Sequence, residues 1–325
     1  MIMRRREERA ERVPFEPLTE DSPYIRPPFD IRPFRHLYPF RSRWLKRGDM
    51  VLHYLDEGAG EPLVLLHGNP TWSFFYRRLV AELSPRCRLI VPDHMGCGLS
   101  SRPPVSAFAY TLENHVDNLE DLLDHLGLHE GVTLVVHDWG GMIGMACACR
   151  MPARIARIVI LNTGAFLIPQ DKRLPRSLWF VKHVPLLPEL LVQGLNAFSR
   201  GATYLGTRNR MSPEVRRAYT APYNSWQNRI ATLRFVRDIP ASPRDRSYGV
   251  AAWVDRHLGL FSETPMLICW GEGDFVFDKT ILLEWMRRFP KAETRTYPEA
   301  GHYILEDVPG PVVEKIVDFM NRHPL

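Results

Sequence analysis

The stretch Leu134-Val135-Val136-His137-Asp138-Trp139-Gly140-Gly141 joins an apolar run to a charged residue and two glycines. The run predicts a buried strand, the glycines permit a tight turn, and a helix is expected from about residue 142. This strand–turn–helix pattern is typical of a nucleophile elbow, which exposes one side chain at the top of a sheet. Here that side chain is Asp138, a carboxylate that is ionised at neutral pH and can attack carbon without a base. The competing interpretation is that Asp138 only caps the helix.

A second apolar run lies upstream and ends in a polar turn, Pro62-Leu63-Val64-Leu65-Leu66-His67-Gly68-Asn69-Pro70. In folds with a nucleophile elbow, the loop after this strand supplies one backbone N–H to the oxyanion hole. The residue after the nucleophile supplies the other. The predicted donors are therefore the amides of Asn69 and Trp139.

Two further strand-like segments each lead to a residue suited to catalysis. Residues 265–271 are apolar and precede Asp274, and residues 293–298 precede Gly301-His302. The chain order nucleophile, acid, histidine is that of an α/β-hydrolase triad. The sequence therefore predicts an α/β-hydrolase fold, with a mostly parallel eight-stranded sheet and helices on both faces.

The chain divides by composition into an arm, a core and a cap. Frequent prolines forbid a long helix in residues 1–40, which are expected to form an extended arm. Residues 41–163 and 246–325 are expected to form the core. Residues 164–245, named the cap segment below, lack strand signals and predict helices inserted over the site. Their apolar residues would either line a substrate channel or pack the cap against the core: Phe166, Leu167, Trp179, Phe180, Leu187, Leu191 and Phe198.

Composition excludes several classes of protein. The chain has 325 residues, of which 45% are hydrophobic, enough for a large domain with an insertion. No run approaches the ~20 apolar residues of a membrane span, and no signal peptide is expected. The 5 cysteines lack framework spacing, which favours reduced thiols and a cytoplasmic location. No zinc spacing, dinucleotide motif or phosphate loop occurs, so we expect no metal and no cofactor.

The net charge of +5 does not by itself predict a nucleic-acid partner. Part of it lies in a mixed-sign run, residues 3–9, that is expected to be a solvated arm. The alternative is a weak electrostatic tether to an acidic partner or to an anionic membrane surface.

Four motifs carry a resemblance to a known family. H-G-N-P-T-W-S (67–73), H-D-W-G-G (137–141), L-N-T-G-A-F (161–166) and the final Gly301-His302 resemble the haloalkane dehalogenase family. The resemblance extends from about residue 40 to the C-terminus. Within the family, cap stretches such as N-A-F-S-R-G (196–201) and A-P-Y-N-S-W (221–226) are most similar to the β-lactone decarboxylases of bacterial olefin biosynthesis.

The resemblance implies roles for four of the site residues. Asp138 would be the nucleophile, and His302 the base that activates water in dehalogenases. Asn69 and Trp139 would bind the leaving group through their side-chain N–H donors.

The resemblance also implies where the acid that orients His302 lies. One branch of the family places a glutamate where this chain has Asn162, which cannot hold a negative charge. We therefore expect the acid to be Asp274. Asp278 competes, but it directly precedes a predicted helix and fits the N-cap of that helix better.

Three chemistries fit a carboxylate nucleophile with an apolar substrate. The first is decarboxylation of a long-chain cis-β-lactone to a cis-olefin, and the second is dehalogenation through an alkyl-aspartyl ester. The third, epoxide hydrolysis, would use two cap tyrosines, for which Tyr204, Tyr219, Tyr223 and Tyr248 are available. A non-enzymatic scaffold is the remaining hypothesis, and an intact set of Asp138, His302 and Asp274 argues against it.

Overall fold

The structure is a computed structural model that describes residues 13–325, so the run 3–9 lies outside the described part. Within that part, one nine-stranded sheet has the order β1-β2-β3-β5-β4-β6-β7-β8-β9. The pairs β1–β2, β2–β3 and β3–β5 are antiparallel, and the remaining pairs are parallel. The strands are β1 (Glu16–Leu18), β2 (Ser42–Arg47), β3 (Met50–Glu57), β4 (Glu61–Leu66), β5 (Cys87–Pro92), β6 (Val132–His137), β7 (Ile155–Leu161), β8 (Met266–Gly271) and β9 (Glu293–Tyr297).

The sheet has one strand more than the eight predicted, because part of the expected arm pairs with the sheet. Residues Glu16–Leu18 form β1, whose middle residue Pro17 lies opposite Leu45 of β2. A proline lacks an N–H and is tolerated here because β1 is an edge strand. The arm was predicted from its prolines alone, which cannot distinguish an extended segment from an edge strand.

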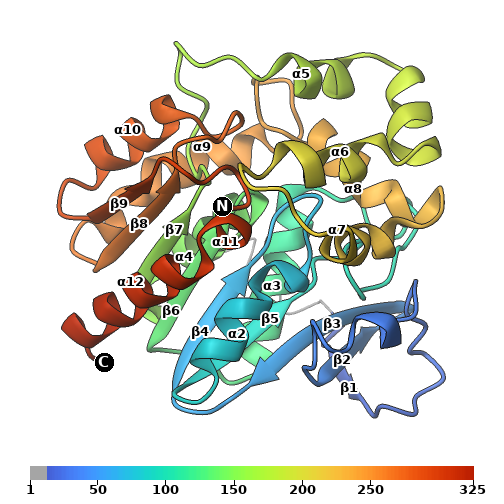
Figure 1. Cartoon of the computed structure of the whole chain (residues 1–325), viewed down its shortest axis with the longest axis horizontal. Helices are drawn as coiled ribbons and strands as arrows, with labels where there is room; N and C mark the ends of the chain where they lie inside the picture. Colours follow the sequence, from blue (N-terminus) through green and yellow to red (C-terminus); the bar gives the residue numbers. More distant parts are fainter. Residues whose placement is uncertain (1–12) are drawn as a thin grey trace.

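Helices cover both faces of the sheet, as predicted (Figure 1). The helices of the core are α2 (Arg77–Leu83), α3 (Leu112–His125), α4 (Trp139–Arg150), α9 (Tyr248–His257), α10 (Lys279–Arg288), α11 (Ile304–Asp307) and α12 (Pro309–Arg322). Helices α3, α4, α9 and α10 share a buried cluster with Val64 and Leu66 on one face. Helices α2 and α12 share another cluster with Leu63 and Leu65 on the opposite face. Successive β4 residues thus face opposite layers, which explains why the strand is continuously apolar.

Four helices of the cap segment lie above the core in Figure 1, between β7 and β8 in the chain: α5 (Arg176–His183), α6 (Ala197–Leu205), α7 (Pro213–Thr220) and α8 (Ile230–Arg237). A one-turn π-helix, η4 (Glu189–Gly194), joins α5 to α6. The cap segment has a small buried cluster of its own, formed by Val181, Val192, Leu233 and Val236. Among residues 13–325, no helix combines the length and apolar character needed to cross a bilayer.

Candidate active site

Asp138 stands at the turn between β6 and α4, where the backbone is strained. Its φ of 49° and ψ of −125° are unusual for a residue with a side chain. The side chain makes no capping hydrogen bond to α4, so the helix-cap interpretation of Asp138 is wrong. The turn also needs glycine at position 140, because a Cβ there would lie 2.0 Å from the carbonyl oxygen of Leu66. This close approach lets α4 start directly over the sheet.

The carboxylate of Asp138 is held by backbone donors. The N–H of Asn69 donates to its Oδ1 at 2.6 Å. Burial raises the pKa of this carboxyl above its ordinary value, while His302 and the backbone amides of Asn69 and Trp139 oppose that rise. The two predicted oxyanion-hole amides therefore both act on the carboxyl group of Asp138 itself. Position 68 must be glycine, because a Cβ there would lie 2.0 Å from Oδ1.

His302 lies between two carboxylates. Its Nε2 is 3.6 Å from Asp138 Oδ2, and its Nδ1 is 2.8 Å from Asp274 Oδ2. Burial acts to lower the pKa of His302, but Asp274 and, to a lesser extent, Asp138 outweigh it, so the pKa is raised. Asp274 fixes the orientation of the imidazole, because Nδ1 is in hydrogen-bond reach of its carboxylate.

Asp274 is itself held in place by three donors. Its Oδ1 accepts the N–H groups of Val276 at 2.7 Å and Phe277 at 3.0 Å. Its Oδ2 accepts from Asn162 Nδ2 at 3.1 Å. Asn162 also exchanges two hydrogen bonds with the backbone of Gly271 at the end of β8. The neutral amide at position 162 therefore positions the acid.

Asp278, the competing acid, is engaged elsewhere. Its Oδ1 accepts the N–H of Thr280 at 3.0 Å as the N-cap of α10. Its Oδ2 is 2.6 Å from Lys172 Nζ. The structure thus brings Asp274 to His302 and gives Asp278 the helix-capping position.

The side chains of Asn69 and Trp139 both line the cavity above Asp138 and both touch α8 of the cap segment. Asn69 Nδ2 donates to the carbonyl oxygen of Thr232 at 3.1 Å, which leaves its second N–H for a ligand. The ring of Trp139 lies 5.2 Å from that of Phe235. Cap and core therefore meet at the two predicted leaving-group binders.

The cavity has a volume of about 300 Å³ and a mainly apolar lining. Of the seven apolar cap residues proposed from the sequence, only Phe166 and Phe198 line it. Leu167 and Phe180 pack against buried clusters, and Trp179 and Leu187 are exposed. Composition identified an apolar cap but could not assign its faces. The lining instead includes Leu174, Leu178, Val181, Leu205, Val236, Phe275, Val276 and Phe277.

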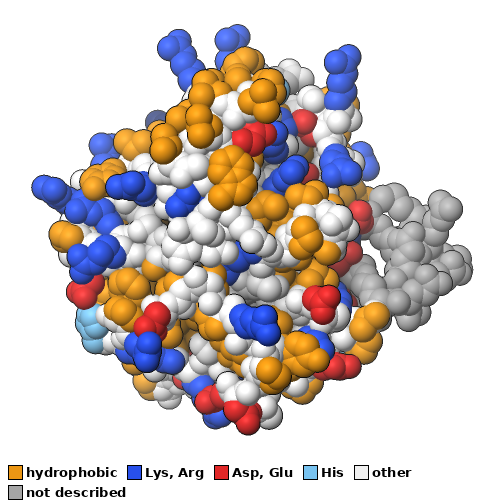
Figure 2. Space-filling view, turned by 90° about the vertical axis from the view of Figure 1, so that its right-hand side faces the viewer, with side chains coloured by type: hydrophobic (Ala, Val, Ile, Leu, Met, Phe, Trp, Pro, Cys, Tyr) orange, Lys and Arg blue, Asp and Glu red, His pale blue; other side chains and the backbone are white. Residues whose placement is uncertain are grey.

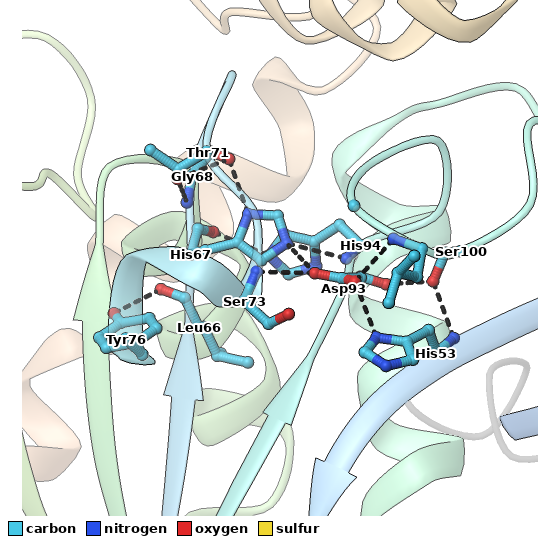
Figure 3. A network of polar contacts seen from close by, with 12 residues as sticks. His53, Leu66, His67, Gly68, Thr71, Ser73, Tyr76, Asp93, His94 and Ser100 are labelled. Carbon is cyan, nitrogen blue, oxygen red and sulfur yellow. Dashed lines mark hydrogen bonds and ion pairs between the residues drawn. The ribbon is translucent and has the colours of Figure 1, made fainter. Parts of the chain in front are cut away.

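A buried polar network beneath the H-G-N-P loop was missed from the sequence (Figure 3). Its centre is Asp93, whose carboxylate accepts the N–H of Ser73 at 2.7 Å and that of Leu99 at 2.8 Å. His53 Nδ1 is 2.7 Å from the same carboxylate. Burial acts to raise the pKa of Asp93, but His53 and the other contacts outweigh it, so the pKa is lowered. The sequence feature that could have revealed this network is the charged residue Asp93 at the end of β5, followed by a glycine-rich turn.

The same network holds the loop that carries Asn69. His67 Nε2 accepts the N–H of His94 at 3.0 Å, and the ring nitrogen His94 Nε2 lies 2.9 Å from the carbonyl oxygen of His67. These reciprocal contacts tie the end of β4 to the end of β5 and so fix the position of Asn69, the predicted oxyanion donor.

Comparison with known proteins supports this description. The model of a family described as the alpha/beta hydrolase fold matches residues 61–309. The chain belongs to the α/β-hydrolase family. It is 52% identical over 287 residues to a cis-3-alkyl-4-alkyloxetan-2-one decarboxylase of Shewanella oneidensis, covering 88% of this chain and 90% of the relative. The α/β-hydrolase fold and the resemblance predicted from the motifs are both confirmed.

Dehalogenases are also similar to this α/β-hydrolase. Haloalkane dehalogenase 2 of Mycobacterium tuberculosis is 34% identical over 293 residues, covering 89% of this chain and 98% of the relative. The solved haloalkane dehalogenase DatA from Agrobacterium tumefaciens superposes with a TM-score of 0.78 at 24% identity, covering 87% of this chain and 97% of that one. The structural likeness supports the fold, and the sequence likeness places the chain among dehalogenases and decarboxylases.

Proposed function

We propose that the protein decarboxylates a long-chain cis-β-lactone to a cis-olefin and carbon dioxide, with Asp138 as the nucleophile. The observation that carries this proposal is the 52% identity, over most of both chains, to a cis-3-alkyl-4-alkyloxetan-2-one decarboxylase. The apolar cavity above Asp138 agrees with a substrate that carries two alkyl chains.

The proposed first step is attack of Asp138 Oδ2 on the tetrahedral ring carbon that is bonded to the ring oxygen, and not on the carbonyl carbon. That carbon–oxygen bond breaks with inversion, strain is released, and the ring oxygen becomes part of a free carboxylate on the neighbouring carbon. The side-chain N–H groups of Asn69 and Trp139 would bind this carboxylate, as they line the cavity next to Asp138.

The proposed second step removes carbon dioxide. After inversion, the new Asp138 ester bond and the carboxylate lie on opposite sides of the bond between the two former ring carbons. The electron pair of the breaking carbon–carboxylate bond forms the double bond and expels Asp138 as a carboxylate. Opposite-side elimination then leaves both alkyl chains on one side, so a cis-lactone gives a cis-olefin, and no water is consumed.

Haloalkane dehalogenation is the second candidate, and one observation favours it specifically. The backbone N–H of Asn69 already donates to Asp138 Oδ1, where negative charge would build up if water attacked an ester of Asp138. His302, oriented by Asp274, would be the base that activates this water. The site therefore has the groups for both reactions.

Epoxide hydrolysis is the weakest of the three candidates. Among the described residues, none of the four tyrosines considered from the sequence lines the cavity. Tyr219 is hydrogen-bonded to Glu306, Tyr223 donates to the carbonyl oxygen of Thr71, and Tyr204 is exposed. No pair of cap tyrosines is thus placed to protonate an epoxide oxygen.

We also propose a reducing compartment such as the cytoplasm. All of the cysteines are free and buried: Cys87, Cys97, Cys147, Cys149 and Cys269. Oxidising compartments favour disulfides, whereas buried free thiols act as small apolar residues.

The test of the proposed function is gas chromatography of the products from a synthetic long-chain cis-β-lactone and from 1-bromobutane, run side by side. Conversion of the lactone to the cis-olefin, faster than any release of bromide, is expected. Release of butanol and bromide without olefin formation would instead establish the dehalogenase. Turnover of neither substrate would favour the scaffold hypothesis.

A further inference from the structure

The outer face of the cap segment exposes large apolar side chains to solvent. They lie on α5, on the turn after it, on η4 and near α8. Figure 2 shows hydrophobic side chains gathered over the upper part of this face, with Lys and Arg side chains projecting above them. We name six of these residues the cap patch: Trp179, Leu186, Leu187, Leu190, Leu195 and Trp226.

Part of the cap patch brings together separate segments of the chain around Gly194. Leu190 and Trp226 both lie within 4 Å of the point where a Cβ at Gly194 would stand, at 3.3 and 3.6 Å. Leu190 N–H donates to the carbonyl oxygen of Leu186, and Leu195 N–H donates to that of Leu190. Apolar residues 36 positions apart in the chain are thus gathered on one surface. Contiguous exposed apolar surface of this kind marks an interaction site.

Leu186 is the most exposed residue of the cap patch. It is 81% exposed and has a φ of 63°, in the left-handed region that residues with side chains rarely adopt. Prolines on both sides, at positions 185 and 188, restrict the turn that carries it. The backbone therefore holds the side chain of Leu186 toward solvent in a conformation that is unfavourable for leucine.

The charge around the cap patch selects the partner. Residues 164–245 contain 13 Lys and Arg against 5 Asp and Glu, a net charge of +8. The whole chain has +5, so everything outside the cap segment together carries −3. Lys182 and Arg237 are neutralised by Asp245 and Glu189. Arg176 and Arg200 are exposed, and among residues 13–325 neither has an acidic partner.

The cavity opens beside this surface. Its lining includes the exposed residues Arg173 before α5, Ser177 at the start of α5 and Leu205 at the end of α6. Trp179 of the cap patch follows Ser177 on the same helix. A molecule in contact with the cap patch would therefore be close to the mouth of the cavity.

We propose that the cap patch docks on the surface of an anionic lipid bilayer, with its leucines and tryptophans in the interface and the arginines at the lipid head groups. A segment of net positive charge that exposes apolar residues matches an anionic interface in both charge and polarity. A second copy of this chain fits less well, because pairing two such faces would bring two +8 segments together. The docking itself does not rest on the proposed reaction. With that reaction, it would let an apolar substrate reach the cavity without crossing water.

The experiment is co-sedimentation of the full chain with vesicles of phosphatidylcholine, alone or with about one third phosphatidylglycerol. The affinity for the anionic vesicles is expected to exceed that for the neutral vesicles by roughly tenfold or more. Added salt should weaken the binding to the anionic vesicles. Leu186→Ser/Leu190→Ser and Arg176→Glu/Arg200→Glu should each weaken binding by roughly tenfold or more.

Matched controls come from outside the cap segment. Leu260→Ser/Leu283→Ser replaces two leucines that are each about half exposed, as Leu190 is, and Arg78→Glu/Arg86→Glu replaces two exposed arginines. Both controls should bind anionic vesicles like the wild type, and all variants should unfold at similar temperatures.

The proposal is overturned if the wild type does not bind anionic vesicles or if both cap variants bind as the wild type does. Patch-dependent dimerisation without vesicle binding would also overturn it, in favour of a protein interface. Because the readout is vesicle binding, its failure leaves the proposed reaction untouched.

Discussion

The core and the cap segment of this protein differ in charge and in where their apolar residues lie. Outside the cap segment the net charge is −3, and two large buried clusters flank the sheet. The cap segment carries +8, has one small cluster of its own and exposes leucine and tryptophan on its outer face. The core supplies Asp138, His302 and Asp274, and the cap supplies most of the apolar lining. Under the proposed function, the core would carry the chemistry and the cap segment the access of substrate, and substitutions can test the two roles separately.

The largest effect should come from the core nucleophile. Asp138→Ala removes the only group proposed to bond to the substrate, so kcat should fall by roughly 10⁴-fold or more. The measurement is olefin formation from the cis-β-lactone, with thermal unfolding as the check on folding. Turnover within tenfold of wild type, in a folded variant, would remove Asp138 from the mechanism.

The next largest effect should separate the two aspartates of the loop after β8. In Asp274→Asn, the amide cannot hold His302 in the required tautomer, so hydrolysis of 1-bromobutane should fall by roughly 10³-fold or more. Asp278→Asn is the matched control: it alters the N-cap of α10 and the contact with Lys172, and should leave kcat nearly unchanged. Equal losses in the two variants would contradict the assignment of Asp274.

The pH profile should distinguish the two candidate reactions. The pKa of His302 is raised, so the imidazole is protonated below that pKa and cannot accept a proton from water. Bromoalkane hydrolysis should therefore fall about tenfold for each pH unit below it and recover above it. Lactone decarboxylation as proposed needs an ionised Asp138 and no neutral His302, so its acid limb should follow the raised pKa of Asp138 instead. Coincident acid limbs, measured as initial rates, would show that both reactions use the same protonation state.

The smallest effect should come from narrowing the cap side of the cavity. Gly201 lies on α6, lines the cavity and has nothing within 4 Å of an added Cβ. Gly201→Leu should lower kcat/KM for long-chain lactones by roughly tenfold, with less effect on short-chain ones. Gly249→Leu is the control, because Gly249 is equally open but lies on α9 outside the cavity lining. An unchanged chain-length preference would mean that the alkyl chains do not pass α6.

The core was largely predictable because its motifs stand at strand ends. Each apolar run stops at a polar turn, so the sequence marked Asn69, Asp138 and His302 at one edge of the sheet. The acid was harder to predict, since Asp274 and Asp278 both follow β8. The position of Asp278 before a predicted helix favoured Asp274, and the structure distinguishes the two by the contact of Asp274 with His302 and by the N-cap hydrogen bond of Asp278.

The cap was predictable only in outline. Its leucines and aromatic residues have no fixed period, so the sequence could not say which of them face the cavity, the core or the solvent. Trp179 and Leu187, proposed as channel residues, are exposed, whereas Leu178 and Val236 line the cavity. The edge strand β1 was missed for a related reason. It has only three residues in a proline-rich arm, too few to show the alternation of polar and apolar residues that marks a strand.

The most direct test asks whether Asp138 bonds to carbon. His302→Gln should remove the base for ester hydrolysis while leaving the nucleophile intact, so treatment with 1-bromobutane should leave one butyl group on the protein. Intact-mass spectrometry and peptide mapping should place that group on Asp138, and the Asp138→Asn/His302→Gln variant should carry none. No adduct in a His302→Gln protein that still binds the bromoalkane, or an adduct on another residue, would contradict the account.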